Sequence, residues 1–222
     1  MSRFPRTRIA AGALAAGVLA AGALAGPAGA ATAKSQSLKG TFKIGKGSYF
    51  RMVVKGGTVK GGKFLENASS TATDTTYTPL LPGADGGLRT GRYQPGSAFD
   101  AKGNSLAGRI IKPTGFFGTN FGLLTAAKDP QTGLAVAAPS ITVKNGKLTG
   151  KIAALSASWN KQFFNQGTPK PDGKRPGLTQ PVSGTYSKKT GRYVLTWASQ
   201  IVGGPFDGFT GVWRLTGAFV KG

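Results

Sequence analysis

Basic side chains are the residues of this sequence with the clearest capacity to act on another molecule, because they attract negative charge. The chain carries 29 Lys and Arg against seven Asp and Glu, which gives a formal net charge of +22 at pH 7. The excess is concentrated in two blocks. Residues 34–65 hold eight basic residues and no acid, and residues 144–192 hold ten against Asp172 alone. A surplus of this size favours association with polyanions.

Nine of these cations are our candidates for electrostatic ligand binding. In the first block they alternate with apolar residues, as in strands that have one polar face. In the second block they stand on predicted strands and beside predicted turns. The nine are Lys39, Lys43, Arg51, Lys55, Lys147, Lys151, Lys188, Lys189 and Arg192. We predict that cations from both blocks converge on one area of the folded chain. The alternative is that the charge is spread evenly over the surface and contributes to solubility alone.

Two aromatic clusters form the second group of candidates. Residues 115–122 hold Phe116, Phe117 and Phe121 among three glycines, and residues 162–166 hold two phenylalanines among amides. One interpretation is that these are core residues at strand ends. The other is a mobile aromatic loop that stacks on sugar rings or covers an apolar cavity. Under the second interpretation, the three phenylalanines of residues 115–122 are candidate ligand-binding residues.

Two residue types on which many enzymes depend are absent from the sequence. Without histidine, the Ser-His triad is excluded and the most common general base and metal ligand are missing. Without cysteine there is no thiol nucleophile and no conventional zinc site. Asp100, Asp129 and Asp172 stand near Gly or Pro and are predicted to serve turns. We therefore predict no catalytic residue, no metal and no cofactor, and keep a hydrolase that uses scattered carboxylates as the last alternative.

The first thirty residues have the organisation of a secretory signal peptide. Three arginines form a positively charged start, and residues 9–25 are a run of small apolar residues. Ala28-Gly29-Ala30 matches the small-residue cleavage pattern, with cleavage after residue 33 as the alternative. The Ala/Gly-rich run resembles signal peptides of high-G+C Gram-positive bacteria. We predict that residues 1–30 are removed, which takes the net charge from +22 to +19, and that the mature protein has no membrane span and is secreted or held at the cell wall.

Turn signals divide residues 34–222 into short segments rich in β-branched and aromatic residues. Asn145-Gly146 is a pair that two-residue hairpin turns of type I′ favour. Further clusters of turn residues stand at 129–133 and 188–191. The Pro/Gly-rich residues 165–181 are predicted to form a long loop, because prolines cannot donate to a sheet. This pattern predicts one all-β domain with few or no helices, an antiparallel β-sandwich or, as the alternative, a closed β-barrel.

The last strand is the clearest one in the sequence. Residues 209–220 place Trp213, Leu215 and Phe219 on one face and mostly polar residues on the other. Gly203-Gly204-Pro205 precedes them and forces a turn. We predict a connecting loop followed by a half-buried strand whose tryptophan lies in the core.

Together these features predict a secreted, strongly basic, non-catalytic binding protein. Its expected partner is anionic: a cell-wall polymer, an acidic polysaccharide or an anionic lipid surface. Nucleic acid is a less favoured partner, because export separates the protein from it and no recognition motif is present. The first alternative is an extracellular carrier that holds an apolar ligand in a β-barrel or sandwich cavity, with the phenylalanines of residues 115–122 near its mouth. The oligomeric state is left open.

Overall fold

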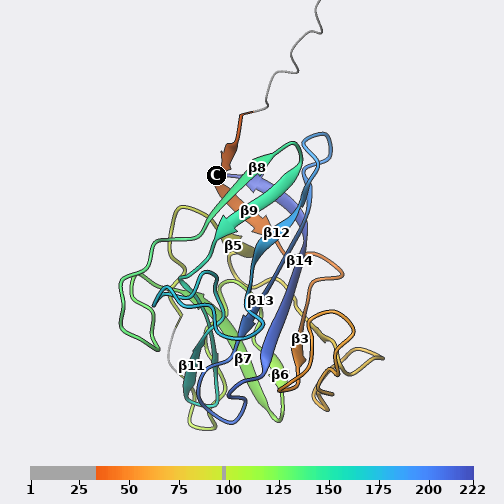
Figure 1. Cartoon of the computed structure of the whole chain (residues 1–222), viewed down its shortest axis with the longest axis vertical. Coiled ribbons are helices and arrows are strands. Elements are labelled where there is room, and N and C mark those ends of the chain that lie inside the picture. The colour runs from red at the N-terminus through yellow and green to blue at the C-terminus, as the bar shows by residue number, and fades with distance from the viewer. Residues whose placement is uncertain (1–33, 97–98) are drawn as a thin grey trace, which may run out of the picture. The chain divides into compact units, whose positions relative to one another are not determined.

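Alternation of apolar and polar residues produces fourteen strands in the part of the chain that is described. The computed structural model describes residues 34–96 and 99–222 (Figure 1). These residues are all-β, as predicted, with strands and turns but no helix among them. The strands form two antiparallel sheets, one large and one small. The predicted signal peptide lies outside the described residues. In the part of the chain that is described, no helix is long and apolar enough to cross a membrane.

The large sheet has ten strands, and each is antiparallel to its neighbours. Eight of them follow one another across the sheet in the order β1 (Gln36–Leu38), β8 (Ser140–Lys144), β9 (Lys147–Lys151), β12 (Gln180–Tyr186), β13 (Arg192–Gln200), β14 (Thr210–Lys221), β2 (Gly40–Lys43) and β5 (Gly87–Arg89). The other two are β3 (Tyr49–Val53), which pairs with β14, and β4 (Thr78–Pro79), which pairs with β3. The long β13–β14 pair forms the centre of the sheet and fixes the direction of its neighbours.

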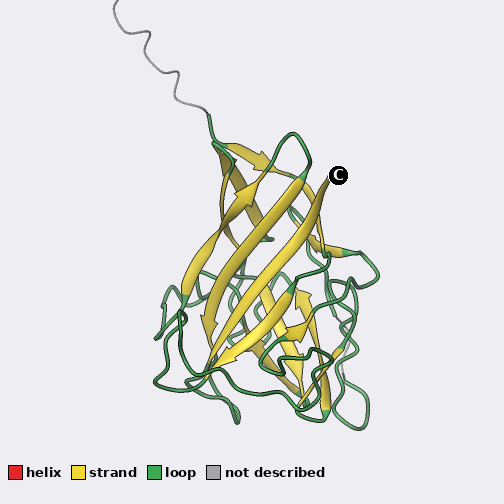
Figure 2. Cartoon of the chain, turned by 90° about the vertical axis from the view of Figure 1, so that its right-hand side faces the viewer, coloured by secondary structure: helices red, strands yellow, loops and turns green. Residues whose placement is uncertain are grey.

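The large sheet curls strongly across its width (Figure 2). β1 and β2 are separated in the chain only by Lys39, yet β1 pairs with β8 and β2 pairs with β14. One short segment therefore joins strands on both sides of the sheet and bends it into half a barrel. The architecture combines features of the predicted sandwich and of the barrel alternative.

The small sheet has four strands in the order β11 (Gln162–Asn165), β10 (Leu155–Trp159), β7 (Thr119–Thr125) and β6 (Thr114–Phe116). Two of its connections, Phe117-Gly118 and Asn160-Lys161, are two-residue turns whose central residues all have positive φ. The β8–β9 turn in the large sheet has the same geometry at Asn145-Gly146, as its sequence predicts. Positive φ at both central residues is the mark of type I′ hairpins.

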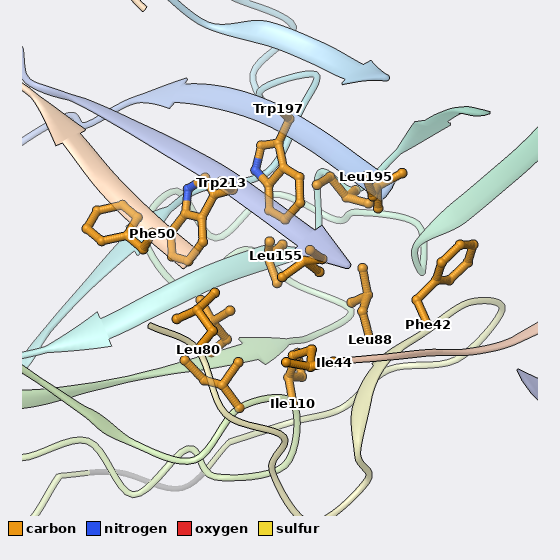
Figure 3. Close-up of a cluster of buried hydrophobic side chains, with 14 of the residues drawn as sticks. Phe42, Ile44, Phe50, Leu80, Leu88, Ile110, Leu155, Leu195, Trp197 and Trp213 are labelled. Atoms are coloured by element: carbon orange, nitrogen blue, oxygen red, sulfur yellow. The ribbon is translucent and has the colours of Figure 1, made fainter. Parts of the chain in front are cut away.

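The hydrophobic core lies between the two sheets (Figure 3). Trp213 of β14 is 1% exposed, as the alternation predicts, and its ring stacks on Trp197 of β13 with ring centres 5.8 Å apart. Leu195, Leu155 and Phe42 continue the core toward the other end of β14. With no disulfide available, this burial supplies the main stabilising free energy of the fold.

The Pro/Gly-rich segment between β11 and β12 contains no strand. Lys170 attaches it to the rest of the fold, because its buried ammonium donates to the carbonyls of Asn165 and Gln200 and to the hydroxyl of Ser199, at 2.7–2.8 Å. Burial lowers the pKa of Lys170 to about 8, although the nearby charges of Asp129 and Asp172 oppose the shift. The lysine therefore has a structural task, and its buried charge makes the stability of the fold dependent on pH.

Candidate functional site

The structure brings basic residues from both sequence blocks to one end of the large sheet. This end is formed by the β8–β9 turn, the β12–β13 turn, the end of β14 and the start of β2 (Figure 1). We call this region the cationic end and define it by seven exposed cations: Lys39, Lys144, Lys147, Lys188, Lys189, Arg192 and Lys221. Five of them are among the nine candidates predicted from the sequence.

Backbone pairing places the parts of the cationic end next to one another. Lys144 and Lys147 face each other across the β8–β9 hairpin, and the carbonyl of Gly146 accepts a hydrogen bond from the amide of Tyr186 at 2.8 Å. The β12–β13 turn joins β14 in the same way, since the amide of Phe219 donates to the carbonyl of Gly191 at 2.8 Å. The series ends at β2, where the amide of Gly222 donates to the carbonyl of Lys39 at 3.2 Å.

Two open hollows beside this end are lined by cations and hydroxyl groups. The first has a volume of about 350 Å³ and lies where the start of β2 meets the end of β5; its basic residues are Lys39, Arg89 and Arg92. The second has a volume of about 420 Å³ and lies over β12, β13 and β14, where Arg192 and Arg214 stand among hydroxyl-bearing side chains. Each hollow can therefore offer positive charge, from Lys39 and Arg92 in the first and from both arginines in the second, together with hydroxyl donors to one anionic group.

A row of hydroxyl groups crosses the outer face of the large sheet below the cationic end. Thr142 of β8 and Thr149 of β9 are 3.0 Å apart at their hydroxyl oxygens. Ser183 of β12 is paired in register with Thr149, and its hydroxyl lies 3.2 Å from that of Thr196 on β13. Arg214 stands opposite Thr196 on β14, so the row ends at a cation of the second hollow. Such a row presents donors and acceptors at the regular spacing of the strands.

Acidic residues lie away from the cationic end. Asp85 forms ion pairs with Arg109 at 3.0 Å and with Arg89 at 3.4 Å, and these are the ion pairs of residues 34–96 and 99–222. Partial burial would raise the pKa of Asp85, but hydrogen bonds from Gln94 and Arg109 and the two guanidinium charges outweigh this effect and lower it. Because Asp85 is already bound to these partners, it leaves the seven cations of the cationic end uncompensated.

The other four basic candidates do not join the cationic end. Lys151 shares the outer face of β9 with Lys147 but stands at the far end of that strand. Lys43 donates to the carbonyl of Asp85 at 3.0 Å. Lys55 follows β3, whose last residues pair with the start of β14.

Arg51 has a structural role. Its guanidinium lies 3.4 Å from the centre of the Phe64 ring and 4.0 Å from that of Tyr77. It also donates to the hydroxyls of Tyr77 and Thr76, each at 3.0 Å. These contacts hold the loop that follows β3 against the sheet, so the charge of Arg51 is not free to bind a ligand.

The aromatic candidates gather at a different place. Phe116 and Phe121 are buried and line a small apolar cavity of about 40 Å³ between the two sheets. Phe117 is 40% exposed and lies at the tip of the β6–β7 turn. Both interpretations of this cluster thus apply to different members, since two of the rings belong to the core and one points outward.

Several basic residues of the site are not among the candidates predicted from the sequence. Lys144, Lys221 and Arg214 stand on strands with clear alternation, so that pattern could have identified them as outward-facing. Arg89 and Arg92 carry no such signal, because the first hollow depends on the pairing of β5 with β2. The hydroxyl row likewise depends on the register between two hairpins, β8–β9 and β12–β13, that are distant from each other in sequence.

Three carboxylates accept hydrogen bonds from backbone amides in turns. Asp100 accepts from the amide of Asn104, Asp129 from the amides of Gln131 and Thr132, and Asp172 from the amide of Lys174. The predicted turn roles of these three residues are confirmed. In the part of the chain that the structure covers, no group of three or more carboxylates is placed to hold a metal ion.

The class that these observations define is an all-β protein of two antiparallel sheets with a cationic end. No protein-family model, curated protein or solved structure matches the chain.

Proposed function

We propose that this is an exported, non-catalytic binding protein whose cationic end captures an anionic polymer of the cell envelope or its surroundings. The observation that carries the proposal is convergence: seven exposed cations from distant parts of the sequence occupy one end of the sheet, while the ion-paired Asp85 lies elsewhere. Like charges repel one another in the free protein. A bound polyanion removes this repulsion and releases its own counterions, and both effects favour the complex.

The chemistry of the site favours a polymer that carries both hydroxyl and anionic groups. Arginine and lysine at the two hollows can bind phosphate, sulfate or carboxylate. The hydroxyl row that ends at the second hollow offers partners for sugar or polyol groups. An acidic polysaccharide or a polyol-phosphate polymer of the cell wall matches this combination more closely than a lipid surface, which presents its charge without a continuous hydroxylated chain.

The test is the affinity for two soluble probes, heparin and poly(glycerol phosphate). We expect the triple substitution Lys188→Gln, Lys189→Gln and Arg192→Gln to weaken binding roughly 10- to 100-fold at moderate salt, since each exposed cation facing a polyanion contributes about 0.5–1 kcal/mol. All three side chains are exposed, so the variant should fold like the wild type. Titration calorimetry at two salt concentrations measures the loss and its dependence on ionic strength.

The matched control removes the same charge from other parts of the chain. Lys60, Lys102 and Lys174 are exposed and stand on loops away from the cationic end. Their replacement by glutamine also lowers the net charge by three, but should change the affinity less than threefold. If the two triple variants lose affinity equally, net charge rather than a defined site governs binding, and the proposal is wrong. Anionic vesicles and duplex DNA, tested in the same way, should bind more weakly than either polymer.

A further inference from the structure

The small apolar cavity between the sheets lies far from the cationic end and has no part in the proposed function. Aromatic side chains form most of its wall, among them Phe50, Phe116, Phe121, Trp159 and Trp213. The register of β14 places it near the start of that strand, since Phe50 pairs with Trp213. The cationic end is reached only at the other end of the same strand.

The polar groups in the cavity wall are already hydrogen-bonded. Trp213 donates through Nε1 to the side-chain oxygen of Gln166 at 3.1 Å, and the side-chain Nε2 of Gln166 donates to the carbonyl of Asn165 at 3.1 Å. Trp159 donates through Nε1 to the carbonyl of Phe116 at 2.7 Å. The cavity therefore has no free hydrogen-bonding group among these residues to bind a polar ligand or water. Apolar cavities of this kind stay dry and accept small hydrocarbons when they are large enough.

Phe206 forms the outer cover of the cavity. Its half-buried ring lies 5.6 Å from Phe116, 5.4 Å from Trp159 and 5.5 Å from Phe117, measured between ring centres. It belongs to the loop between β13 and β14, in which Gly203, Gly204 and Gly208 all have positive φ. The ring is held by contacts with other rings, and the loop closes mainly on itself, as in the hydrogen bond from the amide of Phe209 to the carbonyl of Phe206 at 3.0 Å.

The turn beside this cover gives independent support for a binding role. Phe117 has a φ of 48° at the first central position of its type I′ turn, where asparagine or glycine is preferred. The β8–β9 turn meets the same requirement with Asn145. A left-handed backbone disfavours a bulky side chain, and the Phe117 ring gains only partial burial in return. Local stability therefore favours another residue here, whereas an exposed aromatic ring suits the rim of a site for an apolar ligand.

We propose that this cavity binds an uncharged hydrocarbon group about the size of one aromatic ring, and that the Phe206 ring swings outward to admit it. The present volume of about 40 Å³ is too small for such a group, and the space vacated by the phenyl ring of Phe206 makes up the difference. Phe117 then lines the entrance. The ligand can be a small free molecule or the end of a longer chain, because the entrance opens beside the exposed Phe117.

The binding test uses fluorobenzene as the ring probe and a neutral fluorinated long-chain alcohol as the chain probe, both followed by fluorine NMR. We expect saturable broadening of the fluorobenzene signal that benzene reverses and that is unchanged between 50 mM and 1 M salt. Salt independence separates this site from the cationic end, so either proposal can fail without the other. If the protein binds both the alcohol and fluorobenzene, the site holds the end of a chain. If it binds fluorobenzene but not the alcohol, the ligand is a small free molecule.

Two substitutions locate the binding. Phe206→Ala removes the cover and should strengthen fluorobenzene binding at least fivefold, because no ring has to be displaced. Ala157→Val places two methyl groups in the cavity and should abolish binding, since Ala157 forms part of the wall. A thermal melt shows whether each variant is folded. The proposal is overturned if saturating fluorobenzene leaves the wild-type signal unchanged, or if folded Ala157→Val protein binds it as well as the wild type.

Discussion

Trp213→Ala is expected to lower the free energy of unfolding by about 3–5 kcal/mol, the largest effect of any single substitution considered for this protein. The side chain is 1% exposed and links both sheets: its ring stacks on Trp197 and lies 4.4 Å from Phe50 and 6.2 Å from Phe121 between ring centres. Alanine leaves a large cavity and removes the donor to Gln166. For a domain of this size the loss corresponds to a fall in Tm of about 6–20 °C, measured by calorimetry.

Trp213→Phe separates the two contributions. It keeps an aromatic ring in the core but removes the indole N–H, so it should cost less than half as much as alanine. Val202→Ala is the surface control, because this side chain is 48% exposed and its loss should move Tm by less than 2 °C. A Trp213→Ala protein that melts like the wild type would show that the core does not depend on this ring.

The second large effect is an unusual rise of stability with pH that depends on Lys170. Its pKa is lowered from 10.5 to about 8 by burial in the folded chain. Between these two values the unfolded state binds more protons than the folded state, so the free energy of unfolding increases as pH rises through this interval. The gain approaches 2–3 kcal/mol by pH 10, and urea denaturation at pH 7.5, 9 and 10 measures it. Lys170→Met cannot titrate and should lose this part of the rise.

Two comparisons make the test specific. The relevant quantity is the difference between wild type and Lys170→Met, with exposed Lys174→Met expected to follow the wild type. Burial raises the pKa of Tyr193, so above about pH 10 the unfolded tyrosine ionises first and stability falls; the measurement therefore stops at pH 10. If the free energy of unfolding changes with pH in the same way for wild type and Lys170→Met, the pKa of Lys170 is not lowered by burial.

Local patterns predicted those parts of the fold that depend on neighbouring residues. Asn145-Gly146 forms a type I′ turn because asparagine and glycine tolerate positive φ, which is a property of the two residues alone. The alternation around Trp213 identified a strand and its buried face. The curl of the large sheet was not accessible in this way. It depends on β1 and β2 pairing with strands more than 100 residues further along the chain.

The candidate site shows the same division. Alternation correctly predicted that Arg51 points away from the core. It could not predict that the ring of Phe64, thirteen residues later, packs on the guanidinium, so that Arg51 is not part of the site. Lys170 lies in a Pro/Gly-rich stretch whose composition predicts an exposed loop. It is buried because its ammonium donates to carbonyls of β11 and β13, which no local sequence pattern places next to it. The sequence around Phe206 predicts only a turn. Its position over the cavity depends on contacts with Phe116 and Trp159 of the small sheet.

The most direct test of a cationic capture site is to measure which lysines a polyanion covers. Limited acetylation with and without poly(glycerol phosphate), followed by mass spectrometry, reports the accessibility of each lysine separately. We predict strong protection of the lysines of the cationic end: Lys39, Lys144, Lys147, Lys188, Lys189 and Lys221. Lys60, Lys102 and Lys174 should react at the same rate in both samples. Equal protection of both groups would contradict the account, because it would mean that the polymer binds the whole basic surface and that the convergence of charge has no function.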